Sequence, residues 1–260
     1  LGVAGAAIST LVSRALGAVV MVWLLHSKPH QSDKIHLTSL NIFRPDWSMI
    51  KKILNIGVPN GLENGMFQIG KILVQGLIAT FGTAAIAANA AANSIASLPQ
   101  IPSTAVGLAM VTVIGQCVGA GEYEQAKRYT RRLTMLSYLC ITVLSLAEMA
   151  AAYPLAGLFN LSPEATQMAV QVILWNGVFT IVIWPASFTL PNGLRAAGDV
   201  RFTMGISVLS MWIFRIGFSY LLAQGLQLGL MGVWFAMFID WFVRAVLFIW
   251  RFLSNRWRGK

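Results

Sequence analysis

The sequence predicts an all-α membrane protein that crosses the bilayer several times. Of its 260 residues, 57% are hydrophobic and 11% are charged, whereas about a quarter of the residues in an ordinary soluble domain are charged. Apolar stretches of about 20 residues or more, the length that a helix needs to cross the hydrocarbon core, recur from one end to the other. Short polar connections separate these stretches and leave no room for a soluble domain. Composition and periodicity therefore predict a polytopic helical bundle.

Glycines, prolines and clusters of charge delimit seven predicted spans. They are Ala4–Leu25, Ile50–Phe81, Ala84–Val118, Leu133–Tyr153, Pro163–Leu190, Phe202–Ala223 and Leu228–Phe252. The second and third spans are longer than a bilayer requires. In the third, Pro99 and Pro102 should bend the helix, because each proline removes a backbone donor and crowds the preceding turn.

Basic residues predict the orientation, because lysine and arginine are retained in short cytoplasmic loops. They occur in the tail and in the connections after the first, third and fifth spans, at Lys28, Lys34, Arg44, Lys51, Lys52, Lys127, Arg128, Arg131, Arg132, Arg195, Arg201, Arg251, Arg256, Arg258 and Lys260. The other connections, residues 81–83, 154–167 and 224–227, contain no lysine or arginine. The C-terminus is expected to be cytoplasmic in a cell (inner or plasma) membrane, and topology explains the net charge of +10 without nucleic acid.

A short internal repeat indicates two lobes. Leu1-Gly2-Val3-Ala4-Gly5 resembles Leu228-Gly229-Leu230-Met231-Gly232, and an apolar stretch with a basic exit follows each. We expect the last six spans to form one lobe and the first to close a preceding lobe outside this chain. The predicted domains are the last helix of an N-terminal lobe (1–27), a cytoplasmic connection (28–48), a C-terminal six-helix lobe (49–253) and a basic cytoplasmic tail (254–260).

Polar side chains in the second span are the first candidates for a functional site. One helical face carries Asn60, Asn64, Gln68, Lys71 and Gln75, with Glu63 to its side. Glu63 lies about 20 Å from the cytoplasmic end, close to the midplane, where charge is costly. With Asn60 and the backbone carbonyl that Pro59 leaves unpaired, it is the candidate site for a cation or proton. The alternative role for Glu63 is a structural partner of Lys71 or of another helix.

The third span carries a second polar stripe, formed by Asn89, Asn93, Ser97, Gln100 and Thr104. If the two stripes face each other, they line a wet cavity. The candidate cavity residues are Asn64, Gln68, Lys71, Asn89, Asn93, Ser97 and Gln100. The alternative is that these side chains hydrogen-bond helices to one another without any ligand.

Charges in the last two spans are expected to be structural. Arg215 and Asp240 lie at similar distances from the connection between these spans, and Arg244 follows Asp240 by one turn, so we expect an ion pair among them. Glu148, near the outer end of its span, has no assigned role and is expected to reach water or Arg215. The sequence has no Ser/His pair, histidine cluster or paired catalytic carboxylates, so an enzyme is disfavoured, and neither a metal site nor a disulfide is expected.

Four segments resemble those of MATE (multidrug and toxic compound extrusion) transporters. They are Ile56-Gly57-Val58-Pro59-Asn60-Gly61-Leu62-Glu63, Gly115-Gln116-Cys117-Val118-Gly119-Ala120-Gly121, Ala126-Lys127-Arg128 and Leu194-Arg195-Ala196-Ala197-Gly198-Asp199. The resemblance implies the C-terminal lobe of a twelve-helix, two-lobe antiporter, a monomer when full length. Such a protein exports organic cations or drugs in exchange for Na⁺ or H⁺ by alternating access, without another cofactor. It also implies that Glu63 is the membrane carboxylate tied to coupling.

One departure from the family pattern bears on the coupling ion. Some members carry a second acid in the fourth helix of this lobe, and the sequence has none around Trp184-Pro185. Two alternatives to a drug exporter stay open. One is a lipid-linked oligosaccharide flippase of the same superfamily, whose cavity should carry more cationic residues. The other is a structural membrane protein that transports nothing.

Overall fold

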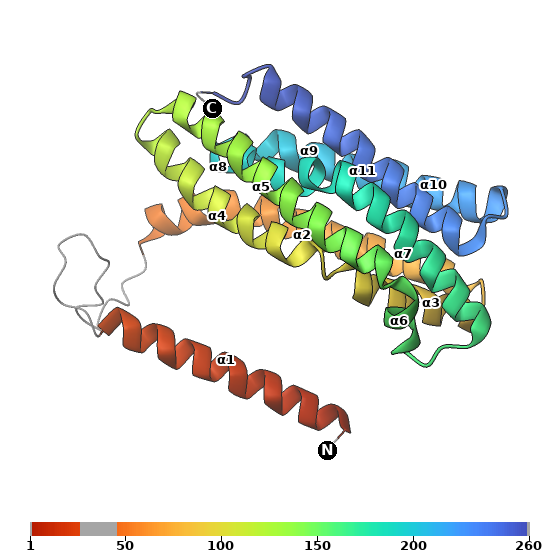
Figure 1. The fold of residues 1–260 in the computed structure, drawn as a ribbon. Coiled ribbons are helices and arrows are strands. Elements are labelled where there is room, and N and C mark those ends of the chain that lie inside the picture. Colours follow the sequence, from red (N-terminus) through yellow and green to blue (C-terminus); the bar gives the residue numbers. More distant parts are fainter. Residues whose placement is uncertain (1, 27–45, 259–260) are drawn as a thin grey trace. The chain divides into compact units, whose positions relative to one another are not determined.

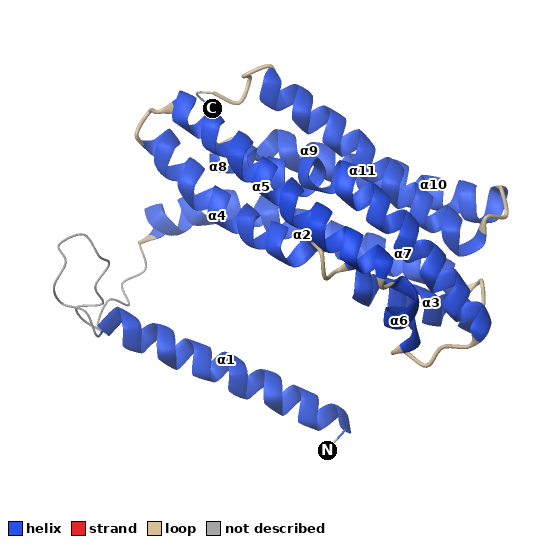
Figure 2. Cartoon of the chain, in the orientation of Figure 1, coloured by secondary structure: helices blue, strands red, loops and turns tan. Residues whose placement is uncertain are grey.

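The computed structural model describes residues 2–26 and 46–258, and within these ranges the chain is helical with short turns and no strand (Figures 1 and 2). It divides into two units, Leu1–Ile53 and Leu54–Lys260. Of the predicted 28–48 connection, residues 28–45 lie outside the described residues. The all-helical membrane fold that the sequence predicts is confirmed.

The first unit contains helix α1 (Gly2–His26) and the first turns of helix α2 (Trp47–Ala79). With 25 residues, α1 is about 37 Å long, enough to cross a hydrocarbon core. The α2 helix begins at an aspartate cap, because the Asp46 carboxylate accepts a hydrogen bond from the backbone N–H of Ser48 at 2.9 Å. Both helices closely match the predicted spans.

The second unit continues α2 and adds the remaining helices. They are α3 (Thr83–Ala96), α4 (Gln100–Gly119), α5 (Tyr123–Ala150), α6 (Ala152–Gly157), α7 (Pro163–Trp184), α8 (Leu190–Ala196), α9 (Val200–Ser210), α10 (Phe218–Tyr220) and α11 (Gly229–Leu253), with π-helical segments Pro185–Thr189, Met211–Gly217 and Leu221–Gly225. Within the described residues, five helical stretches are long and apolar enough to cross a membrane: Gln100–Gly119, Tyr123–Ala150, Pro163–Ala196, Val200–Gly225 and Gly229–Leu253.

The third and fourth predicted spans can be compared with the bounds of helices α3, α4 and α5. The predicted bend of the third span is present, because α3 ends at Ala96 and α4 begins at Gln100, immediately after Pro99. Helix α5 begins at Tyr123, ten residues before the predicted start of the fourth span at Leu133. The added turns are rich in lysine and arginine, which are good helix formers although they do not extend an apolar pattern.

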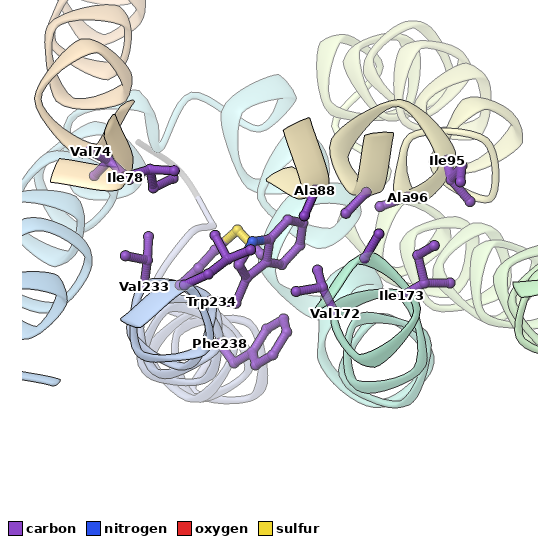
Figure 3. Close-up of a cluster of buried hydrophobic side chains, with 14 of the residues drawn as sticks. Val74, Ile78, Ala88, Ile95, Ala96, Val172, Ile173, Val233, Trp234 and Phe238 are labelled. Atoms are coloured by element: carbon purple, nitrogen blue, oxygen red, sulfur yellow. The ribbon is translucent and has the colours of Figure 1, made fainter. Parts of the chain in front are cut away.

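Polar and aromatic contacts join the helices inside the bundle. The hydroxyls of Ser103 in α4 and Ser137 in α5 are hydrogen-bonded, and Ser137 also lies 3.0 Å from the Thr189 hydroxyl. Between α7 and α11, Phe179 stacks on Phe238 with ring centroids 4.3 Å apart. Figure 3 shows Phe238 beside Trp234 on α11, across from side chains of α7. The aromatics of this interface therefore pack the core, as expected for most of them.

The described part of the C-terminal tail folds back onto the bundle. Trp257 is buried and stacks on Phe252 with centroids 6.1 Å apart. The Lys127 ammonium donates to the Asn255 side-chain oxygen at 2.9 Å, and Arg258 pairs with Glu124 at 2.7 Å. The tail, which we expected only to be basic and cytoplasmic, thus anchors the start of α5 in this structure.

Candidate functional site

A cavity of about 360 Å³ lies between α2, α3 and α11. It is lined by Lys71, Val74, Gln75, Ile78, Asn89, Ala90, Asn93, Arg215, Val233, Trp234 and Met237. The polar side chains of α2 and α3 are those of the two predicted stripes, while α11 contributes an apolar and aromatic wall. Figure 3 shows this wall from inside the core, with Val233 and Trp234 on α11 near Val74 and Ile78 of α2. Amphipathic organic molecules suit a cavity with both kinds of surface.

Asn89 is the centre of the polar side of this cavity, which we call the α2–α3 cavity. Its amide nitrogen donates to the Gln75 side-chain oxygen at 3.2 Å, and its amide oxygen accepts from the Trp234 indole at 3.1 Å. Asn93 donates to the same oxygen at 3.0 Å. Asn89 therefore joins three helices and borders the cavity at once, so the two roles considered from sequence coexist in one residue.

A second cavity of about 330 Å³ borders an earlier part of α2, nearer to its N-terminal end. Its lining residues are Asn64, Phe67, Gln68, Lys71, Ser187, Phe188, Pro191, Arg195, Ser207 and Arg244. Lys71 lines both cavities, and together their lining residues on α2 run from Asn64 to Ile78, about four helical turns. Ser97 and Gln100, expected to line a cavity, are not among the lining residues of either, because they lie at the bend between α3 and α4.

The candidate ion site at Asn60 and Glu63 is described only in part. The backbone of both residues lies in α2, where Asn60 is one turn before Asn64 and Glu63 is one turn before Phe67, while their side chains lie outside the described residues. Because Asn64 and Gln68 line the second cavity, Glu63 belongs to the stretch of α2 next to that cavity. Its role in binding a cation stays a prediction.

The expected ion pair in the last two spans forms between Asp240 and Arg244, both on α11, at 3.0 Å. Asp240 also accepts a hydrogen bond from Ser210 at 2.5 Å, and the Arg244 guanidinium lies 4.6 Å from the Phe188 ring centroid. Both charges are almost fully buried. Asp240 thus has a neutralising partner on its own helix.

Arg215 lies near enough to Asp240 for the two charges to attract each other, but it does not form the direct ion pair with Asp240 that we expected. It donates instead to the Met237 sulfur at 3.2 Å and lines the α2–α3 cavity. The reason is the π-helical backbone around and after Arg215. A π-helix advances less per residue than an α-helix, so Arg215 lies closer to the connection than its residue number suggests and meets Met237, one turn before Asp240.

The sequence reasoning missed a second buried ion pair. Arg251 in the last turn of α11 donates to both carboxylate oxygens of Asp199, at 2.6 and 3.1 Å, and its guanidinium lies 4.5 Å from the Phe202 ring centroid. Asp199 is the acid that ends the Leu-Arg-x-x-Gly-Asp segment. A pair separated by 52 positions in sequence carries no periodic signal, so only the family segment pointed to Asp199.

Among the described residues, no three His, Cys, Asp or Glu side chains gather as ligands for a metal ion. A helical membrane bundle with a cavity that is polar on one side and aromatic on the other has the architecture of a membrane transporter lobe. Comparison with known proteins identifies which kind. The MatE family model matches residues 59–221, so the chain belongs to the MatE family.

Curated relatives and solved structures agree with this assignment. A probable multidrug resistance protein NorM of Thermotoga maritima is 27% identical over 260 residues, covering 100% of this chain and 55% of the relative. An uncharacterized transporter YisQ of Bacillus subtilis is 27% identical, covering 100% and 56%. The chain therefore spans about half the length of the curated relatives it matches, as one lobe of a two-lobe transporter would.

Solved MATE structures share the fold. An outward-facing multidrug resistance MATE family transporter of the MOP superfamily matches with a TM-score of 0.84 and 22% identity over 98% of this chain and 57% of that one. A MOP superfamily transporter from Pyrococcus furiosus, described as having a binding pocket of reverse polarity, gives the same TM-score and identity. The expectations of membership in the MATE family and of a multi-pass membrane protein are confirmed.

Proposed function

We propose that this chain is the C-terminal lobe of an antiporter that exports amphipathic organic cations or drugs in exchange for Na⁺ or H⁺ by alternating access. The α2–α3 cavity is the single observation that carries the proposal. Polar groups within membrane helices are costly unless they contact protein or water. Here the amides of α2 and α3 face an aromatic wall across a hollow of about 360 Å³, the arrangement that binds an amphipathic molecule. The names of the curated relatives support the proposal, and the C-terminus is proposed to be cytoplasmic.

Energy coupling is assigned to Glu63. A midplane carboxylate binds Na⁺ or a proton, and the occupied and empty states favour different conformations of α2 and of the bent pair α3–α4. Such binding drives the change only to the extent that the ion prefers one state. The lysine and arginine that line this lobe's cavity, Lys71 and Arg215, repel an organic cation. Its attraction must therefore come from Glu63, the aromatic wall and the opposite lobe.

Transport by the full-length protein in vesicles tests the proposal. Export of a fluorescent organic cation is measured first under a Na⁺ gradient and then under a pH gradient. Glu63→Gln should abolish ion-driven export while leaving protein abundance unchanged. The matched control is Glu164→Gln, an exposed carboxylate in the first turn of α7, which should transport normally. Undiminished coupled export by Glu63→Gln would remove Glu63 from the mechanism.

One observation favours a second candidate, a flippase of lipid-linked oligosaccharides from the same superfamily. Lys71 and Arg215 are the charged side chains among the lining residues of the α2–α3 cavity, and both are cationic. Cationic groups of this kind bind phosphate, which a lipid-linked sugar carries. Lys71→Gln separates the candidates. It should weaken transport of an anionic lipid-linked substrate strongly, whereas export of an organic cation should be unchanged or faster.

A further inference from the structure

A group of buried polar side chains lies between α5 and α7, apart from both cavities. It consists of Ser145, Glu148, Asn176 and Thr180, which we call the α5–α7 polar cluster. Relative exposure is 0% for Ser145, 5% for Glu148, 1% for Asn176 and 0% for Thr180. None of the polar side-chain atoms of these residues has a hydrogen-bond partner in the protein, including both Glu148 oxygens. Buried polar groups without partners are rare, and an ion is one of the ordinary explanations.

The packing of the two helices brings the four residues to one level. A methyl group placed at Gly177 would meet the Met149 side chain and lie 3.8 Å from the backbone oxygen of Ser145. Gly177 thus faces the turn of α5 that holds Ser145 and Glu148. Asn176 precedes Gly177 directly, and Thr180 follows it by less than one turn. Both helix segments therefore carry their polar residues at the same depth.

The polar side chains also converge around the helix axes. At about 100° per residue, Glu148 lies about 60° to one side of Ser145 on α5. Asn176 and Thr180 lie about 100° and 60° to one side of Gly177 on α7. The helices run antiparallel, because residues in the middle of α5 contact the end of α7 and the segment after it: the Tyr138 hydroxyl donates to the Val182 carbonyl at 3.2 Å, and Ser137 pairs with Thr189. In an antiparallel pair these rotations have opposite senses when viewed along one direction, so they turn the polar groups of both helices toward the same side of the interface.

We propose that the α5–α7 polar cluster binds a single Na⁺ ion, held by the Glu148 carboxylate, the Asn176 amide oxygen and the hydroxyl oxygens of Ser145 and Thr180. Oxygen atoms are the ligands of hard cations, and a Na⁺ ion takes them at distances close to those of Ca²⁺, about 2.3–2.6 Å. Oxygens that coordinate one ion direct their lone pairs at the ion and not at each other, so they need make no mutual hydrogen bonds. This matches four buried polar residues that are close in level yet make no mutual hydrogen bonds.

Charge balance selects a monovalent ion. The cluster has one carboxylate, and no arginine or lysine among the described residues lies within ion-pair distance of it. Arg215, which we expected to be within its reach, contacts Met237 instead. One carboxylate and one Na⁺ are neutral together, whereas a divalent ion would leave a net charge in an apolar surrounding. Glu148 also lies two residues from the end of α5 at Ala150, so an ion has a short path from that end of the bundle.

This site is independent of the coupling role proposed for Glu63, and Na⁺ binding tests it without any transport. Equilibrium binding of radioactive Na⁺ is measured on the purified full-length protein in detergent. Glu148→Gln should remove one bound ion per protein, and the isosteric Thr180→Val should weaken that component at least tenfold. Glu63→Gln and Glu164→Gln are the controls and should keep the Glu148-dependent ion.

The outcomes separate the possible natures of the cluster. If Glu148→Gln does not fold, Thr180→Val and Ser145→Ala carry the test, since both remove one oxygen ligand without removing the charge. Unchanged Na⁺ binding in Thr180→Val and Ser145→Ala would overturn the proposal. It would also be overturned if the folded wild-type protein bound no Na⁺ that depends on Glu148, or if infrared spectra showed Glu148 protonated whether or not Na⁺ was present. Loss of transport in Glu63→Gln with intact Na⁺ binding would leave this site standing.

Discussion

Two buried carboxylates, Asp199 and Glu148, lie near opposite ends of α5 and have opposite surroundings. Asp199, immediately before α9, receives two hydrogen bonds from Arg251 in the last turn of α11 and is neutralised by it. Glu148, near the α6 end of α5, has no partner for either oxygen. The other two buried acids among the described residues, Asp199 and Asp240, are thus each paired with an arginine. A buried acid of this bundle that lacks such a partner, as Glu148 does, is therefore a candidate for ligand binding.

The largest loss of stability is expected at Asp199, because Arg251 donates to both of its carboxylate oxygens. Asp199→Ala leaves the Arg251 guanidinium buried without its counter-charge and should cost about 3–5 kcal/mol of stability. Thermal unfolding of the purified full-length protein in detergent measures the loss. Replacing both residues by apolar ones, Asp199→Leu with Arg251→Met, should recover most of it. If the single substitution had little effect, Asp199 would not be a structural acid and the comparison would fail.

A smaller loss is expected at the paired hydroxyls of Ser103, Ser137 and Thr189. Thr189→Val keeps the shape of the side chain but removes the oxygen that lies 3.0 Å from Ser137 and 3.2 Å from Ser103. Removing one partner of buried hydrogen bonds should destabilise the fold by about 1–2 kcal/mol. The same unfolding assay checks this value, and Thr112→Val, an exposed position on α4, serves as the matched control.

Removing a polar group from the α5–α7 polar cluster should raise stability, whereas the two substitutions above lower it. In Na⁺-free buffer, Thr180→Val removes a buried hydroxyl that has no partner, so the protein should become more stable by up to about 1 kcal/mol. Adding Na⁺ should stabilise the wild type and not this variant, because a ligand that binds only the folded state raises its stability. Destabilisation of Thr180→Val without Na⁺ would show that its hydroxyl is already satisfied.

The smallest effect is expected at the exposed ion pair between Glu124 and Arg258. The Glu124 side chain is 67% exposed, and exposed pairs contribute about 0.2–1 kcal/mol. Glu124→Gln should therefore lower stability by less than any paired buried substitution, and added salt should reduce the difference further. A loss as large as that of Asp199→Ala would mean that exposure does not distinguish the two pairs.

Sequence reasoning recovered the elements that depend on local pattern. The helices of all seven predicted spans are present, and the prolines near residue 100 produce the expected bend, because apolar length and proline sterics act locally. It also placed Asn89 and Lys71 where the structure has a cavity lining. It failed where the position of a side chain depends on the backbone geometry of all the residues between it and a reference point. Arg215 was set beside Asp240 by counting α-helical residues, and two π-helical segments change that count.

Contacts between distant segments left no signal at all. Asp199 and Arg251 join different helices, and Trp257 is buried only because the tail folds back onto α5. Glu148 stood out in the sequence as a membrane acid, but its lack of partners became visible only when α7 was packed against it. Asn176 and Thr180 attracted no attention from the sequence, because single polar residues in a span are common and their depth relative to α5 was unknown.

Access to the α2–α3 cavity from water tests the central claim most directly. After the free cysteines Cys117 and Cys140 are replaced by serine, Asn93→Cys is exposed to a membrane-impermeant thiol reagent in cells that produce the full-length protein. Val143→Cys, an exposed apolar position on α5, serves as the lipid-facing control. If the α2–α3 cavity is part of a transport pathway, Asn93→Cys reacts, a transported substrate slows the reaction, and Val143→Cys stays unlabelled. No reaction at Asn93→Cys, or a rate that no transported substrate changes, would contradict the account.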